Sequence, residues 1–346
     1  MRSLQTTPPR MVEENGSVHF GTFRTPFKDV NILDAPLYSW PVPRFWKNFR
    51  LKEWQHFGII TPAYYFGLVI FDAKLTGVSF FYAYDRKQNT RTESMKQSGK
   101  ALSVAPQVYN GVCRFELPGY AMRIENHLDE GFHRIVLDIK SAGEFPGVQG
   151  DMVVYEDLNQ LEPLVQVSPI TGRRPFYTHK AALPASGNIR LGAENIRLDP
   201  KTCIALLDEQ KTYYPYVSFW KWATAAGYGK DGKLMAFNLC QNMIADDEDA
   251  NENCFWIDGK IYCLKAARFE YGDVMKPWKV WTTDGKLDLS FVPMGQRHQK
   301  INTAGIIRSN FHQPFGLYNG RFTDDSGNIH PISDFFGLAE DHMTRY

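Results

Sequence analysis

Regularly spaced hairpin turns restrict how this chain can fold more than any other feature. Three Asp-Gly pairs begin at Asp231, Asp258 and Asp284, and they stand 27 and 26 residues apart. Each lies between two segments in which apolar and polar residues alternate, and Asp-Gly suits the two positive φ angles of a type I′ hairpin turn. The second half therefore predicts an antiparallel meander. Such a meander removes its unpaired edges by closing into a barrel, and a two-sheet sandwich is the alternative.

The first half has the same texture with less regular spacing. Segments such as "YFGLVIFDA", "GVSFFYAYD" and "HRIVLDIKS" are short, β-branched or aromatic, and separated by Gly, Pro, Asn or Asp. No segment of helical length repeats its apolar residues with a period of 3.6, although a short helix is expected around 44–49. The chain is therefore predicted to be all-β.

Length and composition divide the chain into an arm and two domains. Residues 1–35 are polar and aperiodic, so we expect an N-terminal arm there. The first β domain is assigned to 36–200 and the second to 201–346, since 346 residues suffice for two cores. The segment "SPITGRRPFYTHKAALPASGNIRLG" before the boundary is rich in Pro, Gly, Ser and Arg, and is interpreted as a packed linker.

Charge and cysteine content limit the partners and the compartment. A net charge of +1 gives no basic excess for nucleic acid, so no nucleic-acid partner is predicted. Five cysteines without a CxxC pair are typical of a reducing compartment. The N-terminus has no apolar signal segment, and no apolar stretch is long enough for a transmembrane helix. We expect a cytoplasmic protein, which leaves contact with a membrane surface open.

The densest aromatic segment, "YYPYVSFWKW" at 213–222, holds six rings in ten positions. Alternation along a strand would place one set of side chains on a shared face: Tyr214, Tyr216, Ser218, Trp220 and Trp222. Four rings on one face are too bulky for a tight barrel interior unless they line a hollow. We therefore predict a ligand-binding wall, with a packed core and a domain interface as the alternatives.

An amide lies in phase with small apolar residues further along the chain. Asn238 continues the alternation of Leu234 and Ala236. A buried Asn needs hydrogen-bond partners, which either backbone or ligand can supply. Asn238 is therefore a candidate ligand-binding residue.

Candidate acids and bases precede the aromatic segment. Asp208, Glu209 and Lys211 are expected in a loop at the rim of a barrel, where a carboxylate beside an aromatic pocket would act as a general acid. A solvated turn is the alternative. In the linker, His179 stands beside Tyr177 and is either an acid or base at the domain junction or a surface residue. Asp208, Lys211 and His179 are the candidate catalytic residues.

No cofactor or metal site is predicted. The chain has no GxSxG elbow, P-loop or GxGxxG motif after a strand. Glu340 and His342 are expected on a short final helix, and their spacing of two would not place them on one helix face as metal ligands.

The order of several motifs is similar to a known family. "RPFYTHKAALPASGNIRLG" is followed by "DEQKTYYPYVSFWKWATAAGYGKDGKLMAFNL" and, near the end, by "FGLYNGRFTDDSGNIHPISDFFGLAEDH". This series resembles the DUF2804 family over nearly the whole chain. More distantly it resembles the two-domain lipocalin-like proteins grouped with carotenoid 1,2-hydratase and the AttH-like proteins. One departure is Gln210-Lys211 in place of an expected Arg-Gly pair, which keeps the charge and loses the bidentate geometry of arginine.

The resemblance implies two calycin-like β-barrels in tandem, with an apolar ligand held in or between them. We therefore predict that the protein binds an apolar or amphipathic small molecule, such as a lipid or terpenoid. The alternative is a cofactor-independent hydratase, isomerase or cyclase that acts on such a molecule by general acid catalysis. Aromatic faces would then stabilise a developing carbocation.

Overall fold

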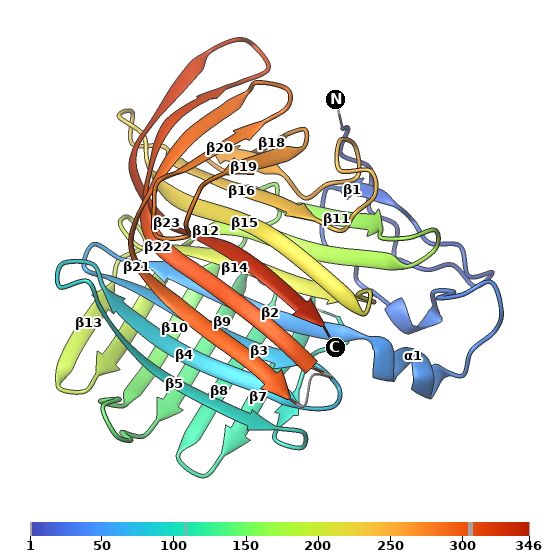
Figure 1. Cartoon of the computed structure of the whole chain (residues 1–346), viewed down its shortest axis with the longest axis horizontal. Coiled ribbons are helices and arrows are strands. Elements are labelled where there is room, and N and C mark those ends of the chain that lie inside the picture. Colours follow the sequence, from blue (N-terminus) through green and yellow to red (C-terminus); the bar gives the residue numbers. More distant parts are fainter. Residues whose placement is uncertain (1, 108, 304–306, 346) are drawn as a thin grey trace. The chain divides into compact units, whose positions relative to one another are not determined.

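Antiparallel β-strands make up most of the protein, which confirms the predicted all-β class. The structure is a computed structural model that describes residues 2–107, 109–303 and 307–345. Strands account for 60% of the chain and helices for 3%. The strands form two sheets, one of fourteen and one of nine strands (Figure 1).

The chain divides into two units. Unit 1 comprises Met1–Leu4, Ser168–Gly172 and Tyr214–Tyr346, and unit 2 comprises Gln5–Val167 and Arg173–Tyr213. The main division thus falls between Tyr213 and Tyr214. Strand β14 (Ile204–Thr212), which the sequence assigned to the start of the second domain, lies in unit 2.

The sheet of unit 2 is a nearly closed barrel. Its main path runs β5-β4-β3-β2-β14-β12-β10-β9-β8-β7-β6, and β1 and β13 pair outside this path, with β11 and β12 respectively. Besides β14, the strands are β1 (Gly21–Phe23), β2 (Lys52–Ile60), β3 (Tyr64–Asp72), β4 (Gly77–Asp85), β5 (Thr90–Ser98), β6 (Leu102–Ser103), β7 (Asn110–Leu117), β8 (Tyr120–His127), β9 (Phe132–Ile139), β10 (Val148–Tyr155), β11 (Leu164–Pro169), β12 (Pro175–Leu191) and β13 (Glu194–Leu198).

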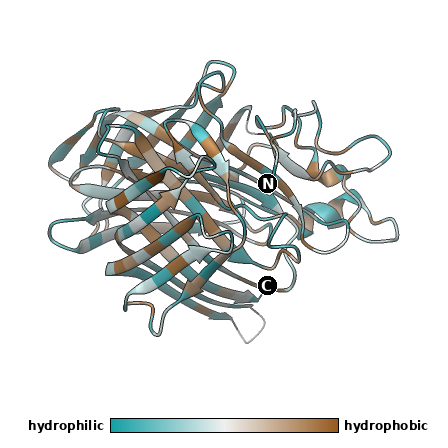
Figure 2. Cartoon of the chain, turned by 90° about the horizontal axis from the view of Figure 1, so that it is seen from above, coloured by the Kyte–Doolittle hydropathy of each residue, from teal (hydrophilic) through white to brown (hydrophobic). Residues whose placement is uncertain are grey.

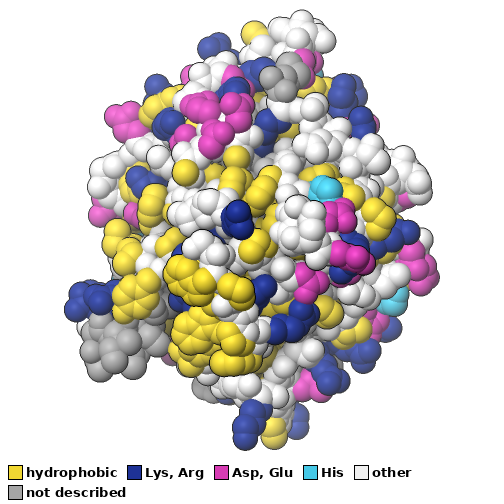
Figure 3. Space-filling model, turned by 90° about the vertical axis from the view of Figure 1, so that its right-hand side faces the viewer, with side chains coloured by type: hydrophobic (Ala, Val, Ile, Leu, Met, Phe, Trp, Pro, Cys, Tyr) yellow, Lys and Arg dark blue, Asp and Glu magenta, His cyan; other side chains and the backbone are white. Residues whose placement is uncertain are grey.

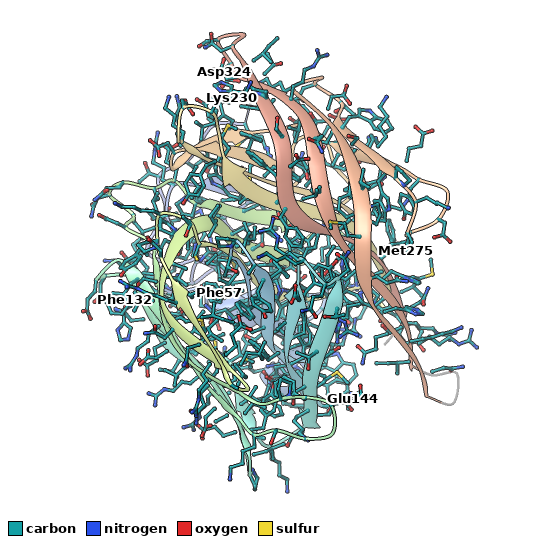
Figure 4. All side chains as sticks on the ribbon, turned by 90° about the vertical axis from the view of Figure 1, so that its left-hand side faces the viewer. Phe57, Phe132, Glu144, Lys230, Met275 and Asp324 are labelled. Carbon is teal, nitrogen blue, oxygen red and sulfur yellow. The ribbon has the colours of Figure 1, made fainter. Side chains whose placement is uncertain are left out.

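Alternate residues of these strands form the core of unit 2. Phe57, Leu207 and Ala181 follow one another across β2, β14 and β12, and all three belong to one buried apolar cluster. Phe57 lies among the inner side chains of this unit in Figure 4. Apolar and polar residues alternate along many strands in Figure 2, as expected when one face of a sheet is buried.

Two expectations about this region are wrong. The predicted linker is largely β12, a strand of 17 residues that pairs with β10, β13 and β14. Gly187 fits a close approach of two strands, because it has a φ of 125° and a Cβ there would lie 2.3 Å from Asp151 O. The predicted rim loop at 208–211 is the middle of β14, which pairs on both sides.

Residues 5–35 of the predicted arm are part of unit 2. They include a short 3-10 helix, η1 (Ile32–Asp34), and the helix α1 (Arg44–Arg50) follows close to its predicted place. Buried side chains of the arm, among them Phe23 and Phe27, share an apolar cluster with Tyr177 and Tyr213.

The sheet of unit 1 is a half-barrel. Its strand order is β18-β17-β16-β15-β23-β22-β21-β20-β19. The strands are β15 (Val217–Tyr228), β16 (Leu234–Asn242), β17 (Cys254–Ile257), β18 (Lys260–Cys263), β19 (Ala267–Glu270), β20 (Trp278–Thr282), β21 (Leu287–Thr303), β22 (Ile307–Thr323) and β23 (Ile329–Arg345).

The three Asp-Gly hairpins are confirmed in unit 1, but only the second has the predicted positive φ at its Asp; Asp231 and Asp284 do not. The three pairs connect β15 to β16, β17 to β18, and β20 to β21. At the second turn both residues have positive φ, 49° at Asp258 and 81° at Gly259, as a type I′ turn requires. The predicted final helix is wrong, because residues 329–345 form β23, which pairs with both β15 and β22.

We predict that Gly337→Ala destabilises the protein. Gly337 lies in β23 opposite Ala225, and an added methyl carbon would lie 2.1 Å from Thr224 O and 2.4 Å from Ala225 Cβ. Relieving these overlaps requires a backbone shift, so the free energy of unfolding should fall by about 2 kcal/mol or more in urea melts. Gly272→Ala is the control, since Gly272 faces open space and should change stability by less than about 0.5 kcal/mol. Equal effects of the two substitutions would contradict the prediction.

Candidate functional site

A network of charged and polar side chains crosses the interior of unit 2. The register places His179, Glu209 and Gln55 side by side across β12, β14 and β2, one row from the core residues Leu207 and Phe57. Because residues two apart in a strand face the same side, these polar side chains point inward with the core. The barrel interior is therefore apolar in one part and ionic in the adjacent part.

Lysines hold one end of this network. Lys211 Nζ lies 3.0 Å from Glu53 Oε1, 2.7 Å from Ala105 O and 3.8 Å from Glu209 Oε1. Lys74 pairs with the other oxygen of Glu53. Burial by itself would lower the pKa of Lys211, but the charges of Glu53 and Glu209 raise it. Lys211 is thus a buried ammonium held by carboxylates.

Histidines hold the other end. Glu156 accepts hydrogen bonds through both oxygens, from His179 Nε2 and from His133 Nε2, each at 2.7 Å. His133 Nδ1 lies 2.6 Å from Asn126 Oδ1, and that oxygen also accepts a hydrogen bond from Gln55 Nε2 at 2.7 Å. All five side chains are buried. The contacts link β2, β8, β9 and β12 across the barrel.

The electrostatics favour an ion pair between His179 and Glu156. Burial would lower the pKa of the His179 imidazole, but the charge of Glu156 and its hydrogen bond raise that pKa to about 9. Burial would raise the pKa of the Glu156 carboxyl, while the charge of His179 and the hydrogen bonds from both histidines lower it to about 2. At neutral pH His179 is therefore a cation beside a carboxylate.

Several polar atoms next to this ion pair lack hydrogen bonds. Among the described residues, Tyr177 Oη, His179 Nδ1 and both carboxylate oxygens of Glu209 are buried without a hydrogen-bond partner. His179 Nδ1 lies 3.7 Å from Glu209 Oε2, beyond hydrogen-bond distance. Burial raises the pKa of Tyr177, and the charges of Glu209 and Glu156 raise it further. Buried donors and acceptors thus lie near one another without direct hydrogen bonds, which is costly unless another polar group bonds to them.

The structure brings together two of the three candidate catalytic residues. His179 and Lys211 lie on either side of Glu209 in the same buried network. Asp208 points to the opposite face of β14, where it accepts a hydrogen bond from Trp54 Nε1 at 3.2 Å and lies 2.8 Å from Lys180 Nζ. Asp208 therefore does not share a face with His179 and Lys211, because strand alternation separates it from them.

The predicted ligand-binding aromatics lie in unit 1 and only partly follow the predicted alternation. Strand β15 begins at Val217, so Tyr214 and Tyr216 precede it. Tyr214 is buried and stacks on Trp220 with ring centroids 6.0 Å apart, whereas Tyr216 is exposed. Trp220 Nε1 donates to Glu340 Oε2 at 2.7 Å. The four rings predicted to share a face therefore do not form one continuous strand face.

The remaining residues of that set are engaged with the protein itself. Trp222 Nε1 donates to Asn238 Oδ1 at 2.6 Å, and Asn238 Nδ2 donates to Glu252 O. Ser218 Oγ donates to Pro215 O. Trp222 and Asn238 are thus partners of each other, which the pairing of Trp222 with Cys240 and of Thr224 with Asn238 allows. That this aromatic set binds a ligand stays a prediction.

Sequence reasoning missed most of the buried polar network in unit 2, including Glu53, Gln55, Asn126, His133 and Glu156. Gln55, Asn126 and His133 each stand two residues from a core position, in phase with Phe57 and with Ile135 on their strands. A lone polar residue in phase with apolar neighbours was the available signal. Glu156 carries no such signal in the sequence, because it follows the end of β10 and is not part of the alternation along that strand.

Neither a metal-binding cluster nor a membrane-spanning helix occurs among the described residues. No group of three or more His, Cys, Asp or Glu side chains in that part of the chain is arranged to hold a metal ion. No helix among those residues is long and apolar enough to cross a bilayer.

The fold and the sequence together define the class of the protein. It is an all-β protein that combines a nearly closed barrel with a half-barrel. Residues 2–346 match the family described as a domain of unknown function, DUF2804, and the chain belongs to that family, as predicted. No curated protein matches it by sequence.

Solved structures share the fold. CghA with Sch210972 is similar with a TM-score of 0.56 and 11% identity, covering 85% of this chain and 88% of that one. An AttH-like protein, NE1406 from Nitrosomonas europaea, has a TM-score of 0.51 and 14% identity, covering 89% and 98%. Kievitone hydratase from Nectria haematococca has a TM-score of 0.50 and 12% identity, covering 85% and 88%. At these identities the likeness concerns the fold alone, and it fits the predicted distant resemblance to AttH-like proteins.

We predict that the ion pair makes stability depend on pH. The pKa of His179 is raised from 6.5 to about 9, so its contribution is complete below pH 6.5 and is lost as pH rises through 9. The free energy of unfolding, measured in urea at pH 6.5 and 9, should fall over this interval. Glu156→Gln should remove most of that fall and destabilise the protein by about 3–5 kcal/mol at pH 6.5.

Glu116→Gln is the matched control, because Glu116 is an exposed glutamate on β7 of the same sheet. It should leave both the stability and its pH dependence within about 0.5 kcal/mol of the parent. An unchanged pH dependence in Glu156→Gln would show that His179 is not held as a cation by Glu156.

Proposed function

We propose that the protein binds an apolar or amphipathic small molecule, of lipid or terpenoid type, whose polar end carries a hydroxyl group. Glu209 accepts a hydrogen bond from that hydroxyl, and Tyr177 Oη or His179 Nδ1 donates one to its oxygen. The observation that carries this proposal is the set of buried, unbonded polar atoms on these three side chains.

The chemistry of these atoms selects the polar group. A hydroxyl is at once a donor and an acceptor, so it can bond the Glu209 carboxylate and a neighbouring donor together. A carboxylate on the ligand would be repelled by Glu209 and Glu156, which lie on either side of His179. A hydrocarbon would leave the buried atoms unbonded, and sites of this kind discriminate strongly against such analogues.

The alternative function is a cofactor-independent hydratase, isomerase or cyclase. One observation favours it, namely that the protonated His179 and the unbonded carboxylate of Glu209 supply an acid and a base side by side. His179 would donate a proton to an alkene carbon, and Glu209 would accept a proton from water or from the carbocation. Kievitone hydratase has a similar fold, which supports this alternative only as an analogy.

We predict opposite effects for two buried tyrosines. Tyr177→Phe removes a hydroxyl that bonds nothing in the described protein, so stability should stay equal or rise, while a hydroxylated ligand should bind about tenfold more weakly. Tyr213→Phe removes a hydroxyl that donates to Ile32 O at 3.1 Å, so stability should fall by about 1 kcal/mol with unchanged affinity.

The assay is displacement of a naphthalene dye by a sesquiterpenoid alcohol, compared with the hydrocarbon that lacks the hydroxyl. Native mass spectrometry of the purified protein tests in parallel for a co-purified lipid. The proposal fails if alcohol and hydrocarbon bind equally, or if Tyr177→Phe and Tyr213→Phe lower affinity alike.

The enzymatic alternative predicts that a carbon atom of the ligand takes up hydrogen from solvent. Ligands that bind are incubated with the protein in D₂O, and the product mass is measured. Protonation of carbon by His179 should incorporate deuterium, and His179→Gln should abolish this incorporation while the dye still binds. Absence of deuterium in every bound ligand would leave binding without catalysis as the function.

A further inference from the structure

The segment around α1 exposes aromatic side chains that most soluble proteins bury. The described part of the chain has five exposed Phe and Trp side chains, and four of them lie within residues 40–49. They are Trp40 (62% exposed), Phe45 (73%), Trp46 (41%) and Phe49 (39%). The helix itself contains no buried residue. Exposed apolar groups gathered in this way mark an interaction surface.

The aromatic rings are arranged by contacts on the protein surface. Trp46 stacks on Phe49 with ring centroids 5.5 Å apart, as residues three apart on a helix can. Trp40 stacks on Tyr38 at 5.0 Å. Strand β2 begins two residues after the helix ends, which attaches α1 to the barrel of unit 2. The rings are therefore presented on a fixed support.

Basic side chains accompany the rings. Residues 38–50 contain Arg44, Lys47 and Arg50 and no carboxylate. The Arg174 guanidinium lies 5.3 Å from the Tyr38 ring centre. Figure 3 shows the side of the molecule at which α1 lies in Figure 1, where hydrophobic side chains gather with Lys and Arg side chains beside them.

The acidic groups near α1 only partly balance this charge. Asp34 pairs with Arg44. A hollow of about 470 Å³ is lined by three basic residues, Arg10, Arg44 and Lys47, and by three acidic residues, Glu13, Glu14 and Asp34. The Arg174 guanidinium, which lies against the Tyr38 ring, adds a further positive charge, so this surface retains a positive excess.

From this combination we propose that residues 38–50 dock the protein on an anionic lipid surface. Trp and Phe rings enter the interface between headgroups and acyl chains, and Lys and Arg side chains contact lipid phosphates. A patch that binds a second copy of this chain would be expected to lack the positive excess, since two identical basic surfaces repel each other. The inference is independent of the ligand proposed for unit 2.

The test is co-sedimentation of the full-length protein with vesicles of phosphatidylcholine alone or mixed with phosphatidylglycerol. Binding should be stronger to the mixed vesicles and should weaken with added salt. The double variant Trp46→Ser/Phe49→Ser should lower the partition coefficient about tenfold or more. Lys47→Gln/Arg50→Gln should remove the preference for the anionic vesicles.

Phe219→Ser is the matched control, because Phe219 is an aromatic residue of unit 1 with a similar exposure of 43%. Its binding should equal that of the parent. Thermal melts check that all variants are folded, and Phe45→Ser replaces the double variant if that one does not fold. The proposal is overturned by absence of vesicle binding, by equal losses in Phe219→Ser, or by a concentration-dependent dimer that only the α1 variants abolish.

Discussion

One buried carboxylate organises the interior of unit 2. Glu156 bonds His133 of β9 and His179 of β12, two strands that β10 separates in the sheet. An ionised carboxylate without exposure is expensive to bury, and only hydrogen-bonded or charged partners offset this cost. Because these partners come from different strands, the charge can be accommodated only when those strands occupy their native positions. The ionic contacts therefore specify the arrangement of the barrel more than they stabilise it.

The same constraint separates the barrel interior into two regions. Leu207 and Phe57 fill one region with apolar packing, and the next row along the same strands holds Glu209 and Gln55. A fully apolar interior would pack more tightly and would be at least as stable. The barrel instead holds a lysine, two histidines and three glutamates, and some of their polar atoms have no hydrogen bond. This arrangement is consistent with a functional site.

The fold was largely predictable because its signals are local. Asp258-Gly259 has the dihedral angles that its sequence predicts, and the alternation of short segments gave the class. The division between the units was not local. Residues 175–191 read as a linker by their Pro, Gly and Ser content, yet they form a long strand whose neighbours lie far away in sequence. Pairing with distant strands overrode composition.

The candidate site was predictable only where residues adjacent in sequence share it. His179 and Lys211 were found because each stands in a motif rich in polar and aromatic residues, but their link through Glu209 depends on the register between β12 and β14. Asp208 shows the limit most clearly. It stands one position before Glu209, and successive side chains of a strand point to opposite faces. Asp208 therefore lies on the face opposite the barrel interior, where Trp54 and Lys180 are its partners. Chemistry that depends on the inner face therefore belongs to the odd-numbered residues of β14.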